Sequence, residues 1–399
     1  MLLKNCRYII TQNGSRAILE KSDILVQNGK IKKIGKALFA QSPAEIIDCS
    51  EKIVMPGLVN THTHLGMHSL KGACDDEELF EWLERLAKEE EKLDAKKVKE
   101  NTKAGLREAI RFGTTTIYDS YKEPMARAQA FGEAGINGII SSTITGTESF
   151  SRAVKFSESS LPENVAPAIA ANSIYACPED VLKKVAKYSD KKRLLRRIHV
   201  GETRKERFDI LEKKGKLAVE YLDSIGFLGK TCLLVHCIWI TKGEIARIAK
   251  AKAKVSHNPV SNMKLASGGV MPLAEMLAAG VCAGLGTDSV ASNNNLDMFE
   301  EMKTAALLHR HHKWDPKAIS AQQILDMATI KGAQCLCVEK RTGSIEVGKQ
   351  ADIITLGPDE NLLPINDPVS SMVFSANGLN VDDVIARGKI LLREKSFFF

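Results

Sequence analysis

Apolar and polar residues alternate with a period of two in two β-rich segments at opposite ends of the chain. Residues 1–55 contain CRYIITQNG and DILVQNGKIKKIG, in which Asn-Gly marks a tight turn between alternating runs. Residues 346–399 repeat this pattern in EVGKQADIITLG and VDDVIARGKILL. Because both ends carry the same strand pattern, we expect them to pair into one small β-sandwich domain.

Between these ends, residues 56–345 repeat a short apolar segment followed by a helical pattern. The candidate strands are 54–60, 114–120, 136–143, 166–172, 195–201, 231–237, 253–258 and 280–287. One of the helical patterns, PEDVLKKVAKY, opens with proline and two acids, which helix N-termini favour. Strands that alternate with helices form a parallel sheet. Eight such units predict the α/β class and a (β/α)8 TIM-type barrel as the catalytic domain.

Composition narrows the classes of function. Of the 399 residues, 56 are Lys or Arg and 49 are Asp or Glu, and the basic residues are scattered over the chain. We therefore expect a solvated surface and no nucleic-acid partner. No run of 18 apolar residues occurs, and MLLKNCRYIITQNG lacks the features of a signal peptide. The nine cysteines follow no C-x-x-C spacing, so we expect reduced thiols, a cytoplasmic location and no membrane partner.

Chemically competent side chains follow several of the predicted strands. They are His62 and His64 after the first strand, His199 and Glu202 after the fifth, His236 after the sixth, His257 after the seventh and Asp288 after the eighth. The active sites of such barrels lie at the C-terminal ends of the strands. We therefore expect these side chains to surround one mouth of the barrel.

His62 and His64 are separated by one residue, so both imidazoles of an extended segment point to the same side. Imidazole nitrogen and carboxylate oxygen suit Zn²⁺ or Fe²⁺. A His-x-His pair alone is weak evidence for a metal. Together with His199 and Asp288 it becomes a set of three histidines and one carboxylate, which can hold one divalent metal and leave a coordination position open.

Each of the later residues also has a purely structural interpretation. Glu202 could be a solvated acid at a helix start, His236 a core histidine, and Asp288 a turn or capping residue. Beside a bound metal, Glu202 could instead transfer protons. Because all of these residues fall at the same end of predicted strands, the catalytic interpretation is favoured.

The motifs PGLVNTHTHLGM, HVGET, VHC, SHNPVSNMKLASG and GTDSVASNNNLDMFEEM resemble the amidohydrolase superfamily. More narrowly, they resemble the branch that holds the 5-methylthioadenosine/S-adenosylhomocysteine deaminases and chlorohydrolase relatives. The resemblance covers nearly the whole chain, including both β segments. It implies one divalent metal, with zinc favoured over iron, and the ligands are His62, His64, His199 and Asp288.

The same resemblance implies roles for the residues around that metal. Glu202 would be the proton shuttle, His236 would orient or polarise the attacked centre, and Asp288 would also take a proton from the attacking water. His257 would support the site without binding metal. The candidate strand 166–172 carries no Lys or Glu that could bridge a second metal, which favours a single ion.

The activity implied by the resemblance is hydrolytic deamination of an adenosine-like nucleoside: 5′-deoxyadenosine, adenosine, methylthioadenosine or S-adenosylhomocysteine. The alternative is an aminohydrolase or chlorohydrolase that acts on a free heterocycle of the cytosine, guanine or triazine type. A third alternative, a non-catalytic barrel that serves as an assembly module, would be expected to lose ligands that are all present here. Barrel enzymes of this kind often associate, so a homo-oligomer is also a possible assembly.

The sequence matches the branch less closely at the residues that would contact the substrate. In this branch a glutamate after Trp-Leu holds the ribose hydroxyls, and by spacing Glu91 in WLERLAKEEE fits best, while Glu89 and Glu90 remain alternatives in the register. The segment from His68 to Asp76 is expected to open the loop that shapes the pocket, with His68 at the pocket edge.

Two departures from the branch concern the substrate tail. Asn172 stands where the branch usually has a histidine, and the segment around Ser142 lacks an arginine that the branch has there. Arg152 could replace that arginine at an amino-acid tail. These departures favour a smaller adenosine-type nucleoside or a free heterocycle over a homocysteine-type substrate.

Overall fold

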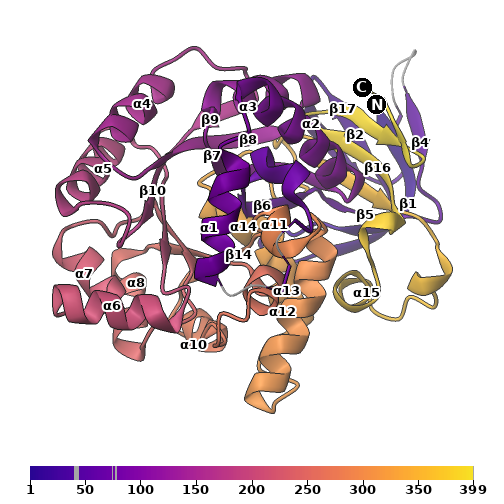
Figure 1. Ribbon diagram of the computed structural model, residues 1–399. Coiled ribbons are helices and arrows are strands. Elements are labelled where there is room, and N and C mark those ends of the chain that lie inside the picture. The colour runs from indigo at the N-terminus through magenta and orange to yellow at the C-terminus, as the bar shows by residue number, and fades with distance from the viewer. Residues whose placement is uncertain (40–44, 74, 77–78, 399) are drawn as a thin grey trace.

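The computed structural model describes residues 1–39, 45–73, 75–76 and 79–398, which form a barrel with a smaller β domain at its side (Figure 1). All eight predicted barrel strands are present in one parallel sheet, and strands adjacent along the chain are adjacent in space. The strands are β6 (Leu58–Thr63), β7 (Thr114–Tyr121), β8 (Asn137–Ile144), β10 (Ile169–Ser173), β11 (Arg196–Val200), β12 (Cys232–His236), β13 (Lys254–His257) and β14 (Cys282–Leu285). A short strand, β9 (Val165–Pro167), also pairs with β8.

The first and last strands meet where the metal ligands were predicted. Thr63 at the end of β6 forms an isolated parallel bridge with Asp288, which follows β14. The Asp288 backbone N–H donates to the His62 carbonyl over 2.9 Å. The nearly closed α/β barrel expected from the sequence is therefore confirmed, and its seam passes through the candidate site.

Helices surround the barrel, so its strands are buried on both faces, as parallel strands require (Figure 1). In order the helices are η1 (Leu65–Leu70), α1 (Leu79–Glu90), α2 (Ala95–Arg111), α3 (Pro124–Ala134), α4 (Thr147–Ser157), α5 (Glu179–Lys192), α6 (Arg204–Lys214), α7 (Ala218–Ser224), α8 (Lys242–Ala251), α9 (Pro259–Lys264), α10 (Leu273–Ala278), α11 (Val290–Asn293), α12 (Met298–Lys313), α13 (Ala321–Met327) and α14 (Ile330–Cys335). The PED segment opens α5 as predicted. Within the described part of the chain, no helix has the length and apolarity needed to cross a bilayer.

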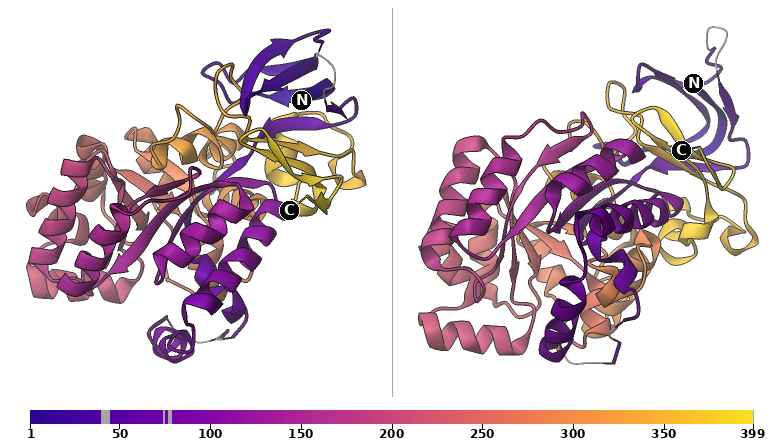
Figure 2. Two further views of the ribbon diagram at one scale, coloured as in Figure 1. Left: turned by 90° about the horizontal axis from the view of Figure 1, so that it is seen from above. Right: turned by 45° about the horizontal axis from the view of Figure 1, so that its top comes forward.

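The two chain ends build the smaller domain together, with both termini on it (Figure 2). Its elements are β1 (Leu2–Ile10), β2 (Ile18–Gln27), β3 (Lys30–Gly35), β4 (Ile46–Asp48), β5 (Ile53–Pro56), β15 (Ile353–Leu356), η2 (Glu360–Leu362), α15 (Pro368–Phe374), η3 (Gly378–Asn380), β16 (Val381–Ala386), β17 (Lys389–Arg393) and β18 (Ser396–Phe397). The strands form one continuous sheet in which β15 pairs with β5, joining the two ends of the chain. Leu3, Ile24, Val54 and Ile353 lie in its own apolar core.

Candidate active site

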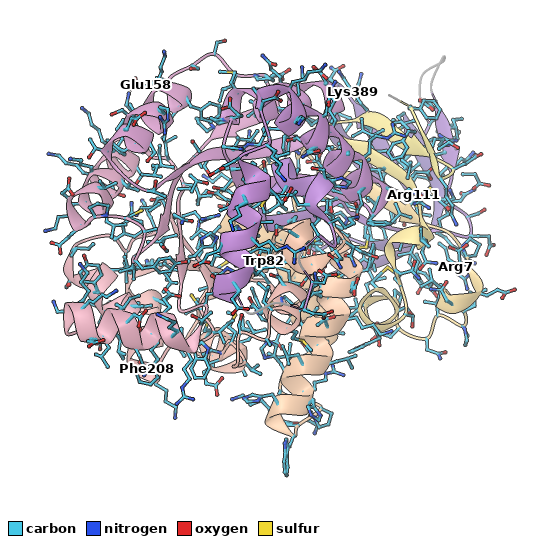
Figure 3. All side chains as sticks on the ribbon, in the orientation of Figure 1. Arg7, Trp82, Arg111, Glu158, Phe208 and Lys389 are labelled. Carbon is cyan, nitrogen blue, oxygen red and sulfur yellow. The ribbon has the colours of Figure 1, made fainter. Side chains whose placement is uncertain are left out.

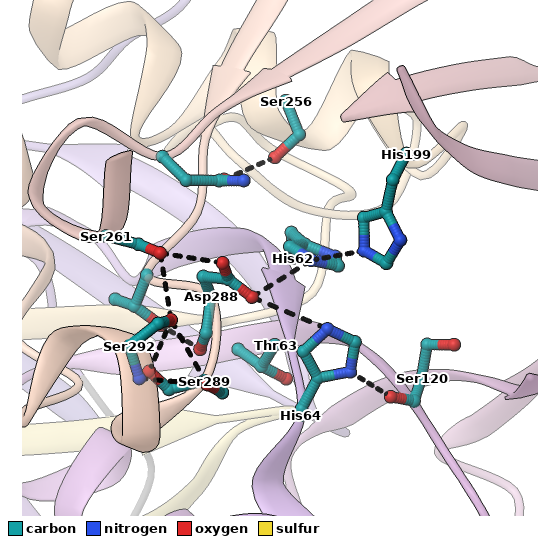
Figure 4. Close-up of polar contacts among 12 residues, drawn as sticks. His62, Thr63, His64, Ser120, His199, Ser256, Ser261, Asp288, Ser289 and Ser292 are labelled. Carbon is teal, nitrogen blue, oxygen red and sulfur yellow. Dashed lines mark hydrogen bonds and ion pairs between the residues drawn. The ribbon is translucent and has the colours of Figure 1, made fainter. Parts of the chain in front are cut away.

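The four predicted metal ligands converge at the C-terminal ends of the strands (Figure 4). Nε2 of His62 lies 3.3 Å from Oδ1 of Asp288, and Nε2 of His64 lies 3.4 Å from the same oxygen. Nε2 of His199 lies 3.3 Å from Nε2 of His62. Ligand atoms of His62, His64 and His199 all fall within 4.8 Å of one another, as do those of His62, His236 and Asp288. Nitrogen and carboxylate donors so arranged fit one divalent transition metal.

The protonation states of these groups suit a metal. Burial lowers the pKa of His62 and of His199 well below its usual range, so both imidazoles are neutral and each has a free lone pair. Burial alone would raise the pKa of Asp288, but the contact with His62 lowers it well below its usual range. A neutral imidazole and an ionised carboxylate are the forms that bind metal.

Neighbouring groups orient the ligands, as outer partners of metal sites commonly do. The Ser120 carbonyl accepts a hydrogen bond from Nδ1 of His64, which leaves Nε2 free to face the other ligands. Ser261 Oγ donates to Oδ2 of Asp288 over 2.8 Å. Nη1 of the buried Arg197 lies 3.2 Å from Nδ1 of His199, beneath the ligand set.

Glu202 and His236 lie beside the ligand set. Oε2 of Glu202 is 3.7 Å from Nε2 of His236, and the Asn262 side-chain oxygen accepts from Nδ1 of His236 over 2.9 Å. Burial raises the pKa of Glu202, which favours the protonated form of its carboxyl group. The backbone N–H groups of Glu202 and Gly201 donate to the Glu206 carboxylate over 2.8 and 3.1 Å. Glu202 is thus a partly buried group on a fixed backbone segment, and its carboxyl group can carry a proton.

Two of the candidate residues have a left-handed backbone. His236 has a φ of 72° and Asp288 a φ of 62°, values that residues other than glycine adopt uncommonly. Such conformations persist only where surrounding structure holds them, and they cluster at functional sites. At both strand ends this local geometry turns the side chain toward the shared mouth.

A cavity of about 360 Å³ opens above these groups. Its lining residues are His64, Met67, Trp82, Leu86, Glu90, Tyr121, Lys122, Thr143, Asn172, Tyr175, His199, Glu202, His236, Leu265, Asp288, Ser289 and Ser292. The metal-side groups form one end of the cavity, which we call the floor. The part formed by α1 and the end of β7 is called the wall. Figure 3 shows the position of Trp82, one of the wall residues, on α1.

Of the predicted substrate contacts, Asn172 lines the cavity but Glu91 does not. Helix α1 ends at Glu90, and the Glu90 carboxyl group faces the cavity, whereas Glu91 lies past the helix end and is exposed. The structure therefore places Glu90, and not Glu91, on the cavity. The physical reason is the helix register: three consecutive glutamates point in three directions, and only one of them faces inward.

Arg152 is also absent from the cavity. It lies exposed on α4, where Nη1 pairs with the Glu148 carboxylate one turn away. Because a helical i,i+4 pair on the surface explains this arginine, a contact with a substrate tail is not supported. Ser142 does not line the cavity either, whereas the next residue, Thr143, does.

The remaining histidines lie outside the cavity. Nε2 of His68 is 2.8 Å from the Glu108 carboxylate, so His68 joins η1 to α2 and is not at the pocket edge. Nε2 of His257 lies 3.0 Å from Nε2 of His309 in a buried pair behind the floor. Within the expected pocket loop 68–76, position 74 lies outside the described residues.

Several residues in or beside the cavity were not identified from the sequence. Asn262, which contacts His236, is part of the SHNPVSN motif and could have been included on that basis. Trp82 opens the WLERLAKEEE segment, from which the substrate-binding glutamate was predicted. The sequence could therefore also have indicated Trp82 as a pocket residue. No sequence signal indicates Tyr121 or Lys122, because their placement depends on how β7 ends.

Comparisons with known proteins identify the family of this chain. A model of the Amidohydrolase family matches residues 53–391. A 5′-deoxyadenosine deaminase of Methanothermobacter thermautotrophicus is 39% identical over 388 residues, covering 94% of this chain and 90% of the relative. A 5-methylthioadenosine/S-adenosylhomocysteine deaminase of Thermococcus onnurineus is 38% identical over 410 residues, covering 100% of this chain and 95% of the relative. The crystal structure of an adenosine deaminase from Xanthomonas campestris with bound zinc is 30% identical, with a TM-score of 0.95, and the match covers 100% of this chain and 94% of that one.

Proposed function

Because this chain belongs to the amidohydrolase family, we propose that it is a hydrolytic deaminase of an adenosine-like nucleoside with one divalent metal, preferably zinc. The family resemblance of the sequence motifs is confirmed, and the chain is a hydrolase that acts on carbon–nitrogen bonds. One observation carries the proposal: a single cavity joins a floor of metal-capable ligands and Glu202 to a wall that presents Glu90.

At the floor, the residues of this chain supply the proton transfers of deamination. When bound, a metal ion would act as a Lewis acid that activates water as the nucleophile. Asp288 accepts a proton from the attacking water through its carboxylate oxygen. Glu202 delivers a proton to the ring nitrogen next to the attacked carbon, and His236 polarises that centre from the adjacent position. The proton held by Asp288 then passes to the amino group, the C–N bond breaks and ammonia leaves. The hydroxyl proton on the attacked carbon returns to Glu202 as the carbonyl forms, which restores both side chains to their starting states.

At the wall, polar groups are available for the sugar. The Glu90 carboxylate can accept hydrogen bonds from two adjacent ribose hydroxyls, and burial raises the pKa of this group. The buried Trp82 indole N–H has no acceptor among the described residues, which leaves it free to donate to a ligand. A buried polar group without a partner costs free energy, so a substrate acceptor at this point would be favourable.

The character of the wall also bears on the 5′ substituent. Lys122 is the one lysine or arginine among the described cavity residues, and its ammonium group already donates to the Glu90 carbonyl. Met67, Trp82 and Leu86 are apolar neighbours. This composition favours a small, uncharged 5′ group, as in 5′-deoxyadenosine or methylthioadenosine, over a charged homocysteine tail.

Ammonia release tests this function. The metal-loaded protein should be compared on adenosine, 5′-deoxyadenosine, methylthioadenosine, S-adenosylhomocysteine, cytosine and guanine at equal concentration. We expect the highest kcat/KM with a nucleoside that has a small 5′ group. Release from the free bases alone would overturn the nucleoside proposal in favour of a heterocycle hydrolase. The cytoplasmic location, the lack of a nucleic-acid partner and a homo-oligomeric state stay predictions of the sequence.

A further inference from the structure

A buried ion pair lies next to the metal-ligand segment. Asp119 on β7 and Arg127 on α3 both have fully buried side chains, and Nη1 of Arg127 donates to Oδ2 of Asp119. Buried charges are tolerated only when they are paired and their remaining hydrogen-bonding atoms are satisfied. The other partners of this pair therefore show what it holds in place.

The carboxylate of Asp119 contacts the backbone and side chains around His64. Its Oδ1 accepts from the Leu65 backbone N–H over 2.7 Å and lies 2.9 Å from Thr63 Oγ1, whose single proton is shared with the Tyr118 carbonyl 3.0 Å away. Thr63 lies between the two histidines of the His-x-His pair, and Leu65 follows the second. The next residue on β7, Ser120, accepts from Nδ1 of His64 through its carbonyl. The end of β7 thus fixes both the backbone around His64 and the ring itself.

The guanidinium of Arg127 contacts the backbone on the cavity side of the ion pair. It donates to the carbonyls of Tyr121 over 2.8 Å, Lys122 over 3.0 Å and Ser141 over 2.6 Å. Tyr121 and Lys122 line the cavity wall. Because one rigid, planar fork makes all of these bonds, the position of the wall is tied to the position of Asp119.

We propose that Asp119 and Arg127 are a positioning pair that sets the metal-ligand segment and the substrate wall relative to each other. Asp119 acts on metal affinity through Thr63 and Leu65, and Arg127 acts on substrate affinity through the carbonyls that follow β7. The inference rests on the proposed metal-dependent function. It assigns a role to two residues that no sequence motif singles out.

The first test separates hydrogen bonding from packing at Thr63. Thr63→Val keeps the volume of the side chain and removes the hydroxyl, whereas Thr63→Ser keeps the hydroxyl. Zinc affinity is measured on chelator-stripped protein by competition with a chromophoric chelator. We expect Thr63→Val to bind zinc about 10-fold more weakly or worse, as found when an outer partner of a metal ligand is lost. Thr63→Ser should bind zinc as wild type does.

A matched control excludes a general loss of stability. Thr102 is a buried threonine on α2 whose hydroxyl donates to the Val98 carbonyl over 2.7 Å, away from the ligands. Thr102→Val should lower the melting temperature of the metal-free protein to a similar extent as Thr63→Val but leave zinc affinity unchanged. Equal zinc affinities in wild type and Thr63→Val would overturn the link from Asp119 to the metal ligands through Thr63. A wild type that binds no zinc would instead overturn the proposed function.

The second test addresses the wall. Asp119→Asn leaves a buried cation unpaired and can prevent folding, so Arg127→Lys, which keeps the charge and loses the planar fork, is the better variant. We expect Arg127→Lys to raise KM for the nucleoside more than it lowers kcat, with metal content retained. An unchanged KM in folded, metal-loaded Arg127→Lys would refute the link to the wall.

Discussion

The floor and the wall of the cavity are built in different ways. The floor consists of residues at or just after the ends of four barrel strands, β6, β11, β12 and β14, and backbone hydrogen bonds across the parallel sheet fix the segments that carry the candidate ligands. The wall consists mainly of α1, a helix inserted between β6 and β7, which contributes Trp82, Leu86 and Glu90. The strand ends thus fix the chemistry of the site, and an added helix adjusts what is bound there.

Metal removal should have the largest effect, because every step at the floor depends on the ligand set. We expect chelator-treated protein to lose ammonia release completely and to regain it with zinc. Since a metal that binds only the folded state stabilises it, the melting temperature should also fall, by the equivalent of about 3 kcal/mol if zinc is present at about 100 times its Kd. Full activity in protein shown to be metal-free would contradict the model of the floor.

Glu202→Gln should have the second-largest effect on activity. The substitution keeps the shape of the side chain but removes proton transfer, so we expect kcat to fall by about 10²-fold to 10⁴-fold with metal content unchanged. Metal analysis and steady-state ammonia assays measure the two quantities separately. The matched control is Glu212→Gln, at an exposed glutamate on α6, which should retain wild-type kcat. Wild-type turnover in Glu202→Gln would exclude this residue as the proton shuttle.

Substitutions of the adjacent residues Glu90 and Glu91 test which glutamate of the wall region contacts the substrate. Glu90→Gln weakens charge-assisted hydrogen bonds to a sugar, each worth about 1.5–3 kcal/mol, so kcat/KM for a nucleoside should fall by about 10-fold to 100-fold. Glu91→Gln should leave kcat/KM unchanged, because this side chain is exposed. Neither variant should change zinc content. Equal losses of kcat/KM in both variants would contradict a specific role of Glu90. A loss only in Glu91→Gln would show that Glu91, the residue expected from spacing, contacts the sugar.

This difference between floor and wall also explains what the sequence could predict. His62, His64, His199 and Asp288 follow apolar segments whose ends are easily located, and parallel strands bring their ends to one edge. No comparable rule selects one of three consecutive glutamates. The direction of the Glu90 side chain depends on where α1 ends, and element boundaries are the least certain part of any pattern. Arg152 lies away from the cavity for a related reason: the sequence pattern does not show that this arginine is on an exposed helix face, paired with Glu148 one turn away.

The prediction with the smallest expected effect on turnover concerns stability, and it involves Glu206, whose carboxylate accepts hydrogen bonds from the backbone N–H groups of Gly201 and Glu202 beneath the floor. Burial, with a contribution from the Glu202 charge, raises the pKa of Glu206 from 4.5 to about 7. Between these values the unfolded chain has released the proton that the folded protein still holds. The stability that this difference contributes is fully present below pH 4.5 and is lost as pH rises through about 7.

For Glu206 the predicted change is about 3 kcal/mol, since each pKa unit corresponds to about 1.4 kcal/mol. Glu206→Gln cannot ionise, so the free energy of unfolding of this variant, relative to wild type, should increase by that amount between pH 4.5 and pH 8. Denaturant titrations of metal-free protein at several pH values measure the difference without interference from metal binding. Glu212→Gln, on the same helix, should follow the wild-type pH dependence. If Glu206→Gln also follows it, Glu206 ionises normally, and the carboxylate beneath Glu202 is more accessible to water than its burial indicates.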